Sequence, residues 1–199
     1  MRRVLLGLTR CFAVACCVGG LGASAAHAAT LNVVAGQLVG ASGVDVGGDM
    51  YDVSFDDGSC ISLFSGCDAI SDFAFGSQAA AIAAAQALLD QVFIDGAQGA
   101  FDTMPNLTRG CTDSTICDAL IPFALDADNA GNVILRVAVN WDAPQSDTQS
   151  QFSLSAASDF TGTDNPYAVF TAVPEPGTGI LLGAGLVLLS VRRRTPAAR

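Results

Sequence analysis

The sequence predicts an α+β body, made mostly of antiparallel β-sheet with one packed amphipathic helix at about residues 78–94. Two observations support this class. Short runs of alternating apolar and polar residues are separated by Gly, Asp and Asn, as is typical of antiparallel strands. One alanine-rich stretch has the composition of a helix. Several strands with a single helix indicate an α+β arrangement.

The first strands of the body are predicted on both sides of a glycine turn. Residues 31–43 contain one or two short strands. Residues 44–46 and 50–55 flank Gly47-Gly48, a dipeptide typical of hairpin turns. The alternation in the second arm places three apolar side chains on one face: Tyr51, Val53 and Phe55.

A further short strand is predicted where Phe73 and Phe75 alternate with small residues. The helix is then expected to begin at Gln78, with Ser77 as its N-cap, and to continue to Ile94, with Gly96 closing its end. Its core face is expected to consist of Ile82, Ala85, Leu88, Leu89, Val92 and Phe93.

The second half of the body is predicted to be loop and then sheet. Residues 95–118 form a loop, and strands follow at 120–125, 132–141, 152–156 and 167–173.

The strand at 132–141 has the clearest alternation in the chain. Arg136 lies on the polar face of this strand and is expected to pair with one of the many aspartates. The apolar face contains Val133, Leu135, Val137, Val139 and Trp141.

The N-terminus has the three zones of a secretory signal peptide. Positive charge comes first, from Arg2, Arg3 and Arg10. An apolar stretch at 11–21 follows, and the small residues Ala26 and Ala28 mark a cleavage site, so the mature chain is expected to begin at Ala29. An alternative is a lipoprotein with Cys16 lipidated, but the usual leucine three residues before the cysteine is absent.

The C-terminus combines three features in a fixed order. Val173-Pro174-Glu175-Pro176 is stiff and extended, because its prolines disfavour helix. The uncharged run 177–191 follows, and then Arg192-Arg193-Arg194. The run is shorter than the roughly 20 residues of a typical membrane-spanning helix, and it spans a bilayer if the bilayer thins locally. The arginines would stay cytoplasmic.

This order of features resembles the PEP-CTERM sorting signal of Gram-negative bacteria, over residues 173–194. The resemblance implies recognition by an exosortase, which is a membrane-embedded cysteine transpeptidase, and removal of the tail at or near Pro-Glu-Pro. It also implies transient anchoring in the inner membrane and later residence in the envelope, at the surface or outside the cell. Exopolysaccharide and matrix proteins are the partners it suggests. The alternative is an ordinary membrane anchor.

The two terminal signals divide the chain into three parts. A signal peptide at 1–28 directs the chain to the Sec translocon, an acidic globular domain covers 29–172, and the sorting signal covers 173–199. The α+β body is thus expected to lie between a signal peptide and a C-terminal transmembrane sorting helix, on the periplasmic side of the inner membrane.

The body is strongly acidic. Between residues 29 and 172 there are eighteen aspartates against Arg109 and Arg136, with no lysine, glutamate or histidine. Nucleic acid is excluded as a partner, because almost nothing would neutralise its phosphates.

Four cysteines remain after removal of the signal peptide. An even number in an exported chain predicts two disulfides. Three pairings are open, and the short-loop pairing Cys60–Cys67 with Cys111–Cys117 is preferred. A zinc site formed by all four thiolates is the alternative, although the spacings are wider than usual for zinc.

The strongest metal candidate is the segment 126–131. Asp126, Asp128 and Asn129 resemble the start of a calcium loop, but Ala130 and Val137 stand where two further ligands are needed. A plain hairpin turn is the simpler interpretation. A second acidic group, also interpreted as exposed loop residues, contains Asp45, Asp49, Asp52, Asp56 and Asp57.

Catalytic motifs are missing from the body. A domain without histidine or lysine offers no Ser-His or Cys-His pair and no lysine nucleophile. We therefore expect a non-catalytic binding or structural protein of the envelope or extracellular matrix, without a cofactor. The alternatives are a secreted glycan hydrolase that uses an aspartate pair and a calcium-binding surface protein.

Overall fold

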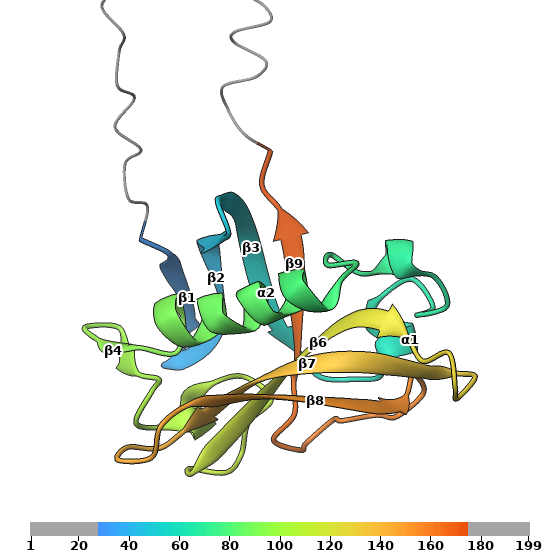
Figure 1. Ribbon diagram of the computed structural model, residues 1–199. Coiled ribbons are helices and arrows are strands. Elements are labelled where there is room, and N and C mark those ends of the chain that lie inside the picture. The colour runs from blue at the N-terminus through green and yellow to red at the C-terminus, as the bar shows by residue number, and fades with distance from the viewer. Residues whose placement is uncertain (1–27, 175–199) are drawn as a thin grey trace, which may run out of the picture.

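A bent seven-stranded sheet, in the order β1-β2-β3-β9-β6-β7-β8, forms the framework of the protein (Figure 1). The computed structural model describes residues 28–174. All neighbouring strands are antiparallel except β9 and β6, which are parallel. The prediction of a mostly antiparallel sheet with few helices is confirmed. The predicted signal peptide, apart from Ala28, and the predicted transmembrane sorting helix lie outside these residues.

One half of the sheet contains β1 (Thr30–Val34), β2 (Gln37–Val46), β3 (Asp49–Asp56) and β9 (Tyr167–Ala172). The predicted hairpin between β2 and β3 is confirmed. Gly47-Gly48 occupies its turn with φ angles of 67° and 102°, which only glycine adopts without strain.

The other half contains β6 (Ile116–Leu125), β7 (Asn132–Trp141) and β8 (Thr148–Ser155). β6 begins four residues before the predicted start at Leu120, because its pairing with β7 continues to Trp141. A single register pair, Leu120 with Tyr167, joins the two halves. Figure 1 shows that the strands of the two halves run in clearly different directions.

The single long helix, α2 (Gln78–Gln91), begins as predicted, with the Ser77 hydroxyl accepting a hydrogen bond from the Ala80 N–H at 3.3 Å. The predicted end at Ile94 is wrong. The chain leaves the helix after Gln91 because Phe93 turns inward to stack on Phe55, with ring centroids 5.4 Å apart. Gly96, the predicted helix stop, lies in the two-residue strand β4 (Asp95–Gly96) instead.

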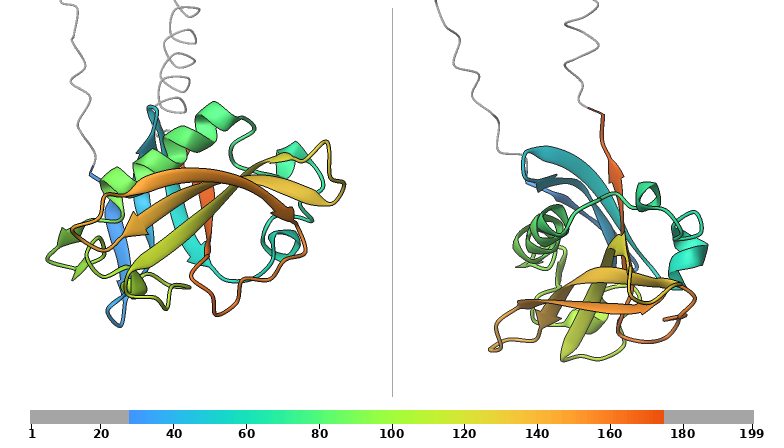
Figure 2. Two further views of the ribbon diagram at one scale, coloured as in Figure 1. Left: turned by 60° about the horizontal axis from the view of Figure 1, so that its bottom comes forward. Right: turned by 45° about the vertical axis from the view of Figure 1, so that its right-hand side comes forward.

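α2 packs over the bend and contacts β2, β6 and β7, so it covers both halves of the sheet (Figure 2). The predicted core position of Ile82 is wrong, since this side chain is 38% exposed. Small side chains allow close approach of the helix to the sheet, and the helix positions that are fully buried are Ala81, Ala84, Ala85 and Leu88.

A second core lies on the opposite face of β6 and β7. It is closed by the segment after β3, which includes the helical turns α1 (Cys60–Leu63) and η1 (Ile70–Asp72). The predicted strand at Phe73 and Phe75 is wrong. Phe73 belongs to this second core and Phe75 to the core under α2, so their alternation reflects two cores and not strand pairing.

Both predicted disulfides are confirmed. Cys60 pairs with Cys67, and Cys111 pairs with Cys117, with Cα atoms 5.9 and 5.5 Å apart. The segment between α2 and β6, predicted as loop, also contains β5 (Gly99–Ala100), paired with β4, and the turn η2 (Pro105–Leu107).

Candidate functional site

The junction between the body and the predicted sorting signal is part of the sheet. Ala172, the last residue of β9, pairs with Tyr51 of β3. One residue later, the Val173 N–H donates to the Met50 carbonyl at 2.9 Å. Pro174 has no N–H and cannot extend this ladder. The predicted signal therefore begins without a spacer after a paired strand.

Both ends of the described chain meet at one pocket of about 350 Å³, here called the junction pocket. It places Ala28, at the predicted signal cleavage site, close to Val173. Ala29 follows directly, one residue before β1. Of the remaining predicted signal residues, Ala26, Glu175, Pro176, Arg192, Arg193 and Arg194 lie outside the described residues. The pocket is lined by Ala28, Thr30, Ser42, Gly43, Met50, Asp52 and Val173.

Sequence reasoning did not find the other pocket residues as a group. They come from β1, β2 and β3 and meet only through the pairing register of these strands. Asp52 is the one charged residue in the lining, and its Oδ1 accepts a hydrogen bond from the Gly43 N–H at 3.1 Å. The two-residue alternation of β3 could have placed Asp52 on the face opposite Val53, but not beside Val173.

The acidic group around the β2–β3 hairpin does not form a common site. The Asp45 Oδ1 accepts from the Gly48 N–H at 2.7 Å, whereas Asp52 binds Gly43. Asp56 instead accepts a hydrogen bond from the Ser54 hydroxyl at 2.7 Å.

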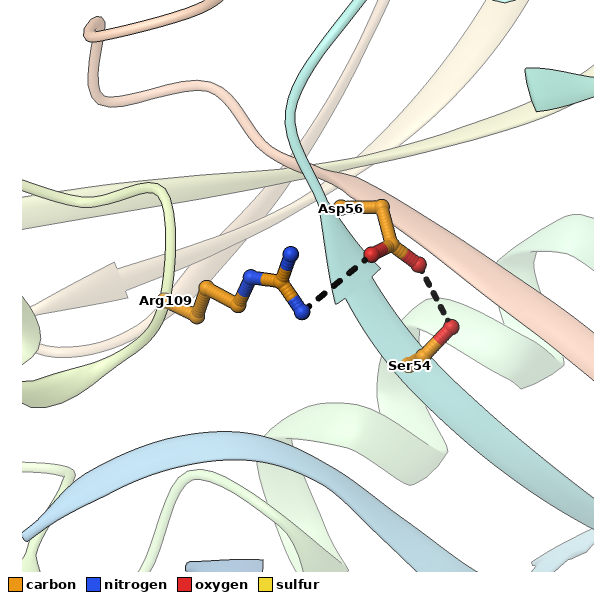
Figure 3. Close-up of polar contacts among 3 residues, drawn as sticks. All are labelled: Ser54, Asp56 and Arg109. Atoms are coloured by element: carbon orange, nitrogen blue, oxygen red, sulfur yellow. Dashed lines mark hydrogen bonds and ion pairs between the residues drawn. The ribbon is translucent and has the colours of Figure 1, made fainter. Parts of the chain in front are cut away.

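Asp56 also forms the one ion pair found within residues 28–174, with the Arg109 Nη1 3.4 Å from its Oδ1 (Figure 3). Half of the Arg109 side chain is exposed, so this pair contributes at most about 1 kcal/mol.

The Oδ1 atom of the neighbouring Asp57 is buried. Burial raises the pKa of Asp57, whereas the positive charge of Arg109 opposes that shift. Gly110 has a φ of 86°, and a Cβ at this position would meet the Asp57 Oδ1 and the ring of Pro166. Gly110 thus permits the Arg109 loop to pack against this carboxylate.

The predicted calcium segment forms the turn between β6 and β7. The Asp126 Oδ1 accepts from the Asp128 N–H at 3.0 Å, and its Oδ2 accepts from the Asn129 side chain and the Ser153 hydroxyl. These hydrogen bonds lower the pKa of Asp126. Its carboxylate therefore fastens the turn to β8, as in an ordinary Asp-rich hairpin turn.

Arg136 does not pair with an aspartate, contrary to prediction. Its Nε donates to the Gln149 Oε1 at 3.0 Å, and no carboxylate of the described residues lies within 4.0 Å. The Gln149 amide in turn donates to Gln86, which donates to Asp90. The Gln149 amide of β8 binds the guanidinium and is itself bound by Gln86 of α2, an arrangement that the strand pattern could not reveal.

Asp118 and Asp164 form an acidic pair near the second core. Burial and the charge of Asp164 raise the pKa of Asp118, whose Oδ1 is buried without a hydrogen-bond partner. Burial also acts to raise the pKa of Asp164, but the N–H groups of Thr112 and Asp113 outweigh it and lower that pKa overall. The different surroundings of the two carboxyl groups thus shift their pKa values in opposite directions.

Between residues 28 and 174, His, Cys, Asp and Glu side chains form no group of three suited to hold a metal ion. The same part of the chain contains no helix that is long and apolar enough to cross a membrane. The predicted span at 177–191 lies outside it.

Comparison with known proteins concerns only the C-terminal segment. Residues 172–194 match the family model described as the PEP-CTERM protein-sorting motif. The predicted resemblance is confirmed, and the match begins one residue before the predicted boundary at Val173. The motif indicates an exosortase-processed, exported protein. No curated protein and no solved structure matches the chain.

Proposed function

We propose that this protein is a non-catalytic component of the cell envelope or extracellular matrix, presented outside the inner membrane and processed at its C-terminal signal. The Sec translocon exports it, the tail holds it transiently in the membrane, and an exosortase removes the tail. The body then acts as a binding or structural module beside exopolysaccharide or other matrix proteins.

The match of residues 172–194 to the sorting motif carries this proposal. The position of the two ends of the described body supports it. Ala28 and Val173 line the same pocket, so a body anchored through either end would present this side to the membrane. The disulfides suit the oxidising compartment that such a route reaches.

The test is mass spectrometry of the protein from membrane, surface and medium fractions of a PEP-CTERM host, with and without its exosortase. We expect a mature N-terminus at Ala29 and loss of the C-terminal arginines only when the exosortase is present. Combined replacement of Pro174, Glu175 and Pro176 by alanine should leave the tail intact. Replacement of Asp128 and Asn129, in an exposed turn, is the matched control and should not affect processing. Full-length protein in the cytosol would refute the proposal.

A second candidate function is hydrolysis of a glycosidic bond by an aspartate pair. Its support is the opposite pKa shifts of Asp118 and Asp164, the pattern of an acid and a base. The buried Oδ1 of Asp118 weighs against it, because a substrate oxygen would have to reach an atom shielded from solvent.

Glycan arrays with a reducing-sugar assay separate the two functions. Binding without release of sugar supports the first. Release of sugar that stops in Asp118→Asn would establish the second.

A further inference from the structure

The sorting motif overlaps the folded body by two residues. The match begins at Ala172, which is paired with Tyr51, and continues to Val173, which is hydrogen-bonded to Met50. Neighbouring strands lie only about 4.8 Å apart. An enzyme that binds the start of the motif must therefore also contact β3.

Ala172 and Val173 cannot leave β3 while β9 stays in the sheet. β9 lies between β3 and β6 in the sheet and pairs with β3 along its whole length. Release of β9 would separate the two halves of the sheet. An enzyme that binds Ala172 and Val173 thus meets the folded sheet at the start of the motif.

That surface is concave where the motif leaves it. The junction pocket includes Val173, which is 36% exposed, and the half-buried Met50. Asp52 is the one charged side chain in its lining, and removal of the signal peptide would take Ala28 from the pocket edge and leave the amino group of Ala29 beside it. A small, mostly apolar pocket of this kind suits an apolar side chain of a partner.

We propose that the junction pocket is a docking surface for the membrane-embedded processing enzyme, which inserts an apolar side chain of its outer rim between Thr30 and Val173. The argument for this partner is that Val173 belongs both to the pocket lining and to the matched motif, so the pocket adjoins the segment that the enzyme processes. Part of the enzyme's specificity then lies in the folded body. This inference rests on the proposed processing.

The first test fills the pocket in the full-length chain. Thr30 is exposed on β1, so Thr30→Trp occupies the pocket at little expected cost to the fold. Processing, followed by pulse-chase in a host with its exosortase, should slow about tenfold, the factor for a loss of about 1.4 kcal/mol in docking. Thr30→Val preserves the side-chain volume, and Val34→Trp places the same ring at the exposed far end of β1. Both controls should be processed like the wild type.

The second test separates docking from simple obstruction. A spacer of about six Gly and Ser residues between Ala172 and Val173 moves the motif from the pocket by a root-mean-square distance of about 14 Å. If the pocket docks the enzyme, the spacer variant is processed more slowly than wild type and no longer responds to Thr30→Trp. This comparison holds even if Thr30→Trp lowers stability.

Two results would overturn the inference. Equal processing of Thr30→Trp and wild type would show that the pocket is not used, and faster processing with the spacer would show that the body only obstructs. Either result leaves the proposed function intact. Absence of wild-type processing in a host that trims other PEP-CTERM proteins would refute the proposed function as well.

Discussion

The two halves of the sheet differ in how many of their faces are covered. In β6 and β7, Ile121 and Ala138 pack under α2, while Leu135 and Val137 pack against the segment with the Cys60–Cys67 disulfide. In β3, Val53 and Phe55 face α2, whereas Asp52 on the opposite face is exposed. We expect the doubly covered half to contribute more of the stability, whereas the singly covered half holds both ends of the described body.

Matched core truncations give the largest expected contrast between the halves. Leu135→Ala, at a fully buried position of β7, should lower the free energy of unfolding by about 3 kcal/mol, because the cavity cannot collapse between two packed layers. Leu31→Ala, at a half-buried position of the edge strand β1, should cost less than about 1.5 kcal/mol. Urea denaturation of both variants measures the contrast. Equal losses of unfolding free energy in the two variants would mean that the second covering layer adds nothing to the stability of β7.

Removal of the disulfide that closes the second core has the next largest expected effect. Replacement of Cys60 and Cys67 by alanine should cost about 2 kcal/mol, because the unfolded chain regains the entropy of the short loop. The measurement is the urea midpoint under non-reducing conditions. The matched pair, Cys111 and Cys117, closes a similar loop and should cost about the same by loop entropy. A loss below about 0.5 kcal/mol for the first pair would show that packing alone holds the second core.

The smallest expected effect is a pH-dependent gain in stability when Asp118 is replaced by asparagine. Its pKa is raised in the folded state, so its charged form at neutral pH opposes folding, and protonation removes this penalty as pH falls. Asp118→Asn should therefore be more stable than wild type at about pH 7, by less than about 1 kcal/mol after solvent screening, and the gain should vanish near about pH 3.

Urea midpoints across this pH range give the measurement for Asp118→Asn. Asp128→Asn removes the same charge from the exposed β6–β7 turn and serves as the control. If Asp118→Asn remained more stable than the wild type at low pH, the gain in stability would come from packing and not from the charge of Asp118.

Local patterns predicted much of the framework. The Gly47-Gly48 turn, the Ser77 N-cap and the strand at 132–141 each depend on neighbouring residues, and each is confirmed. The short-loop cysteine pairs were the preferred of three pairings for the same reason, since close spacing makes a short loop easy to close.

Contacts between distant segments could not be predicted. The end of α2 depends on the stacking of Phe93 on Phe55, and the partner of Arg136 comes from β8. Asp118 and Asp164 are brought together by the connection between β8 and β9, with the Asp118 N–H donating to the Asp164 carbonyl at 2.8 Å. No periodicity in the sequence indicates which of these distant residues contact each other.

The sequence by itself determined the sorting signal, because the motif is defined by proline, apolar and arginine segments in linear order. Only the tertiary structure decided that this signal begins inside the sheet and at the same pocket as Ala28. Strand register sets that position, and register follows from the packing of whole strands against α2 and against each other.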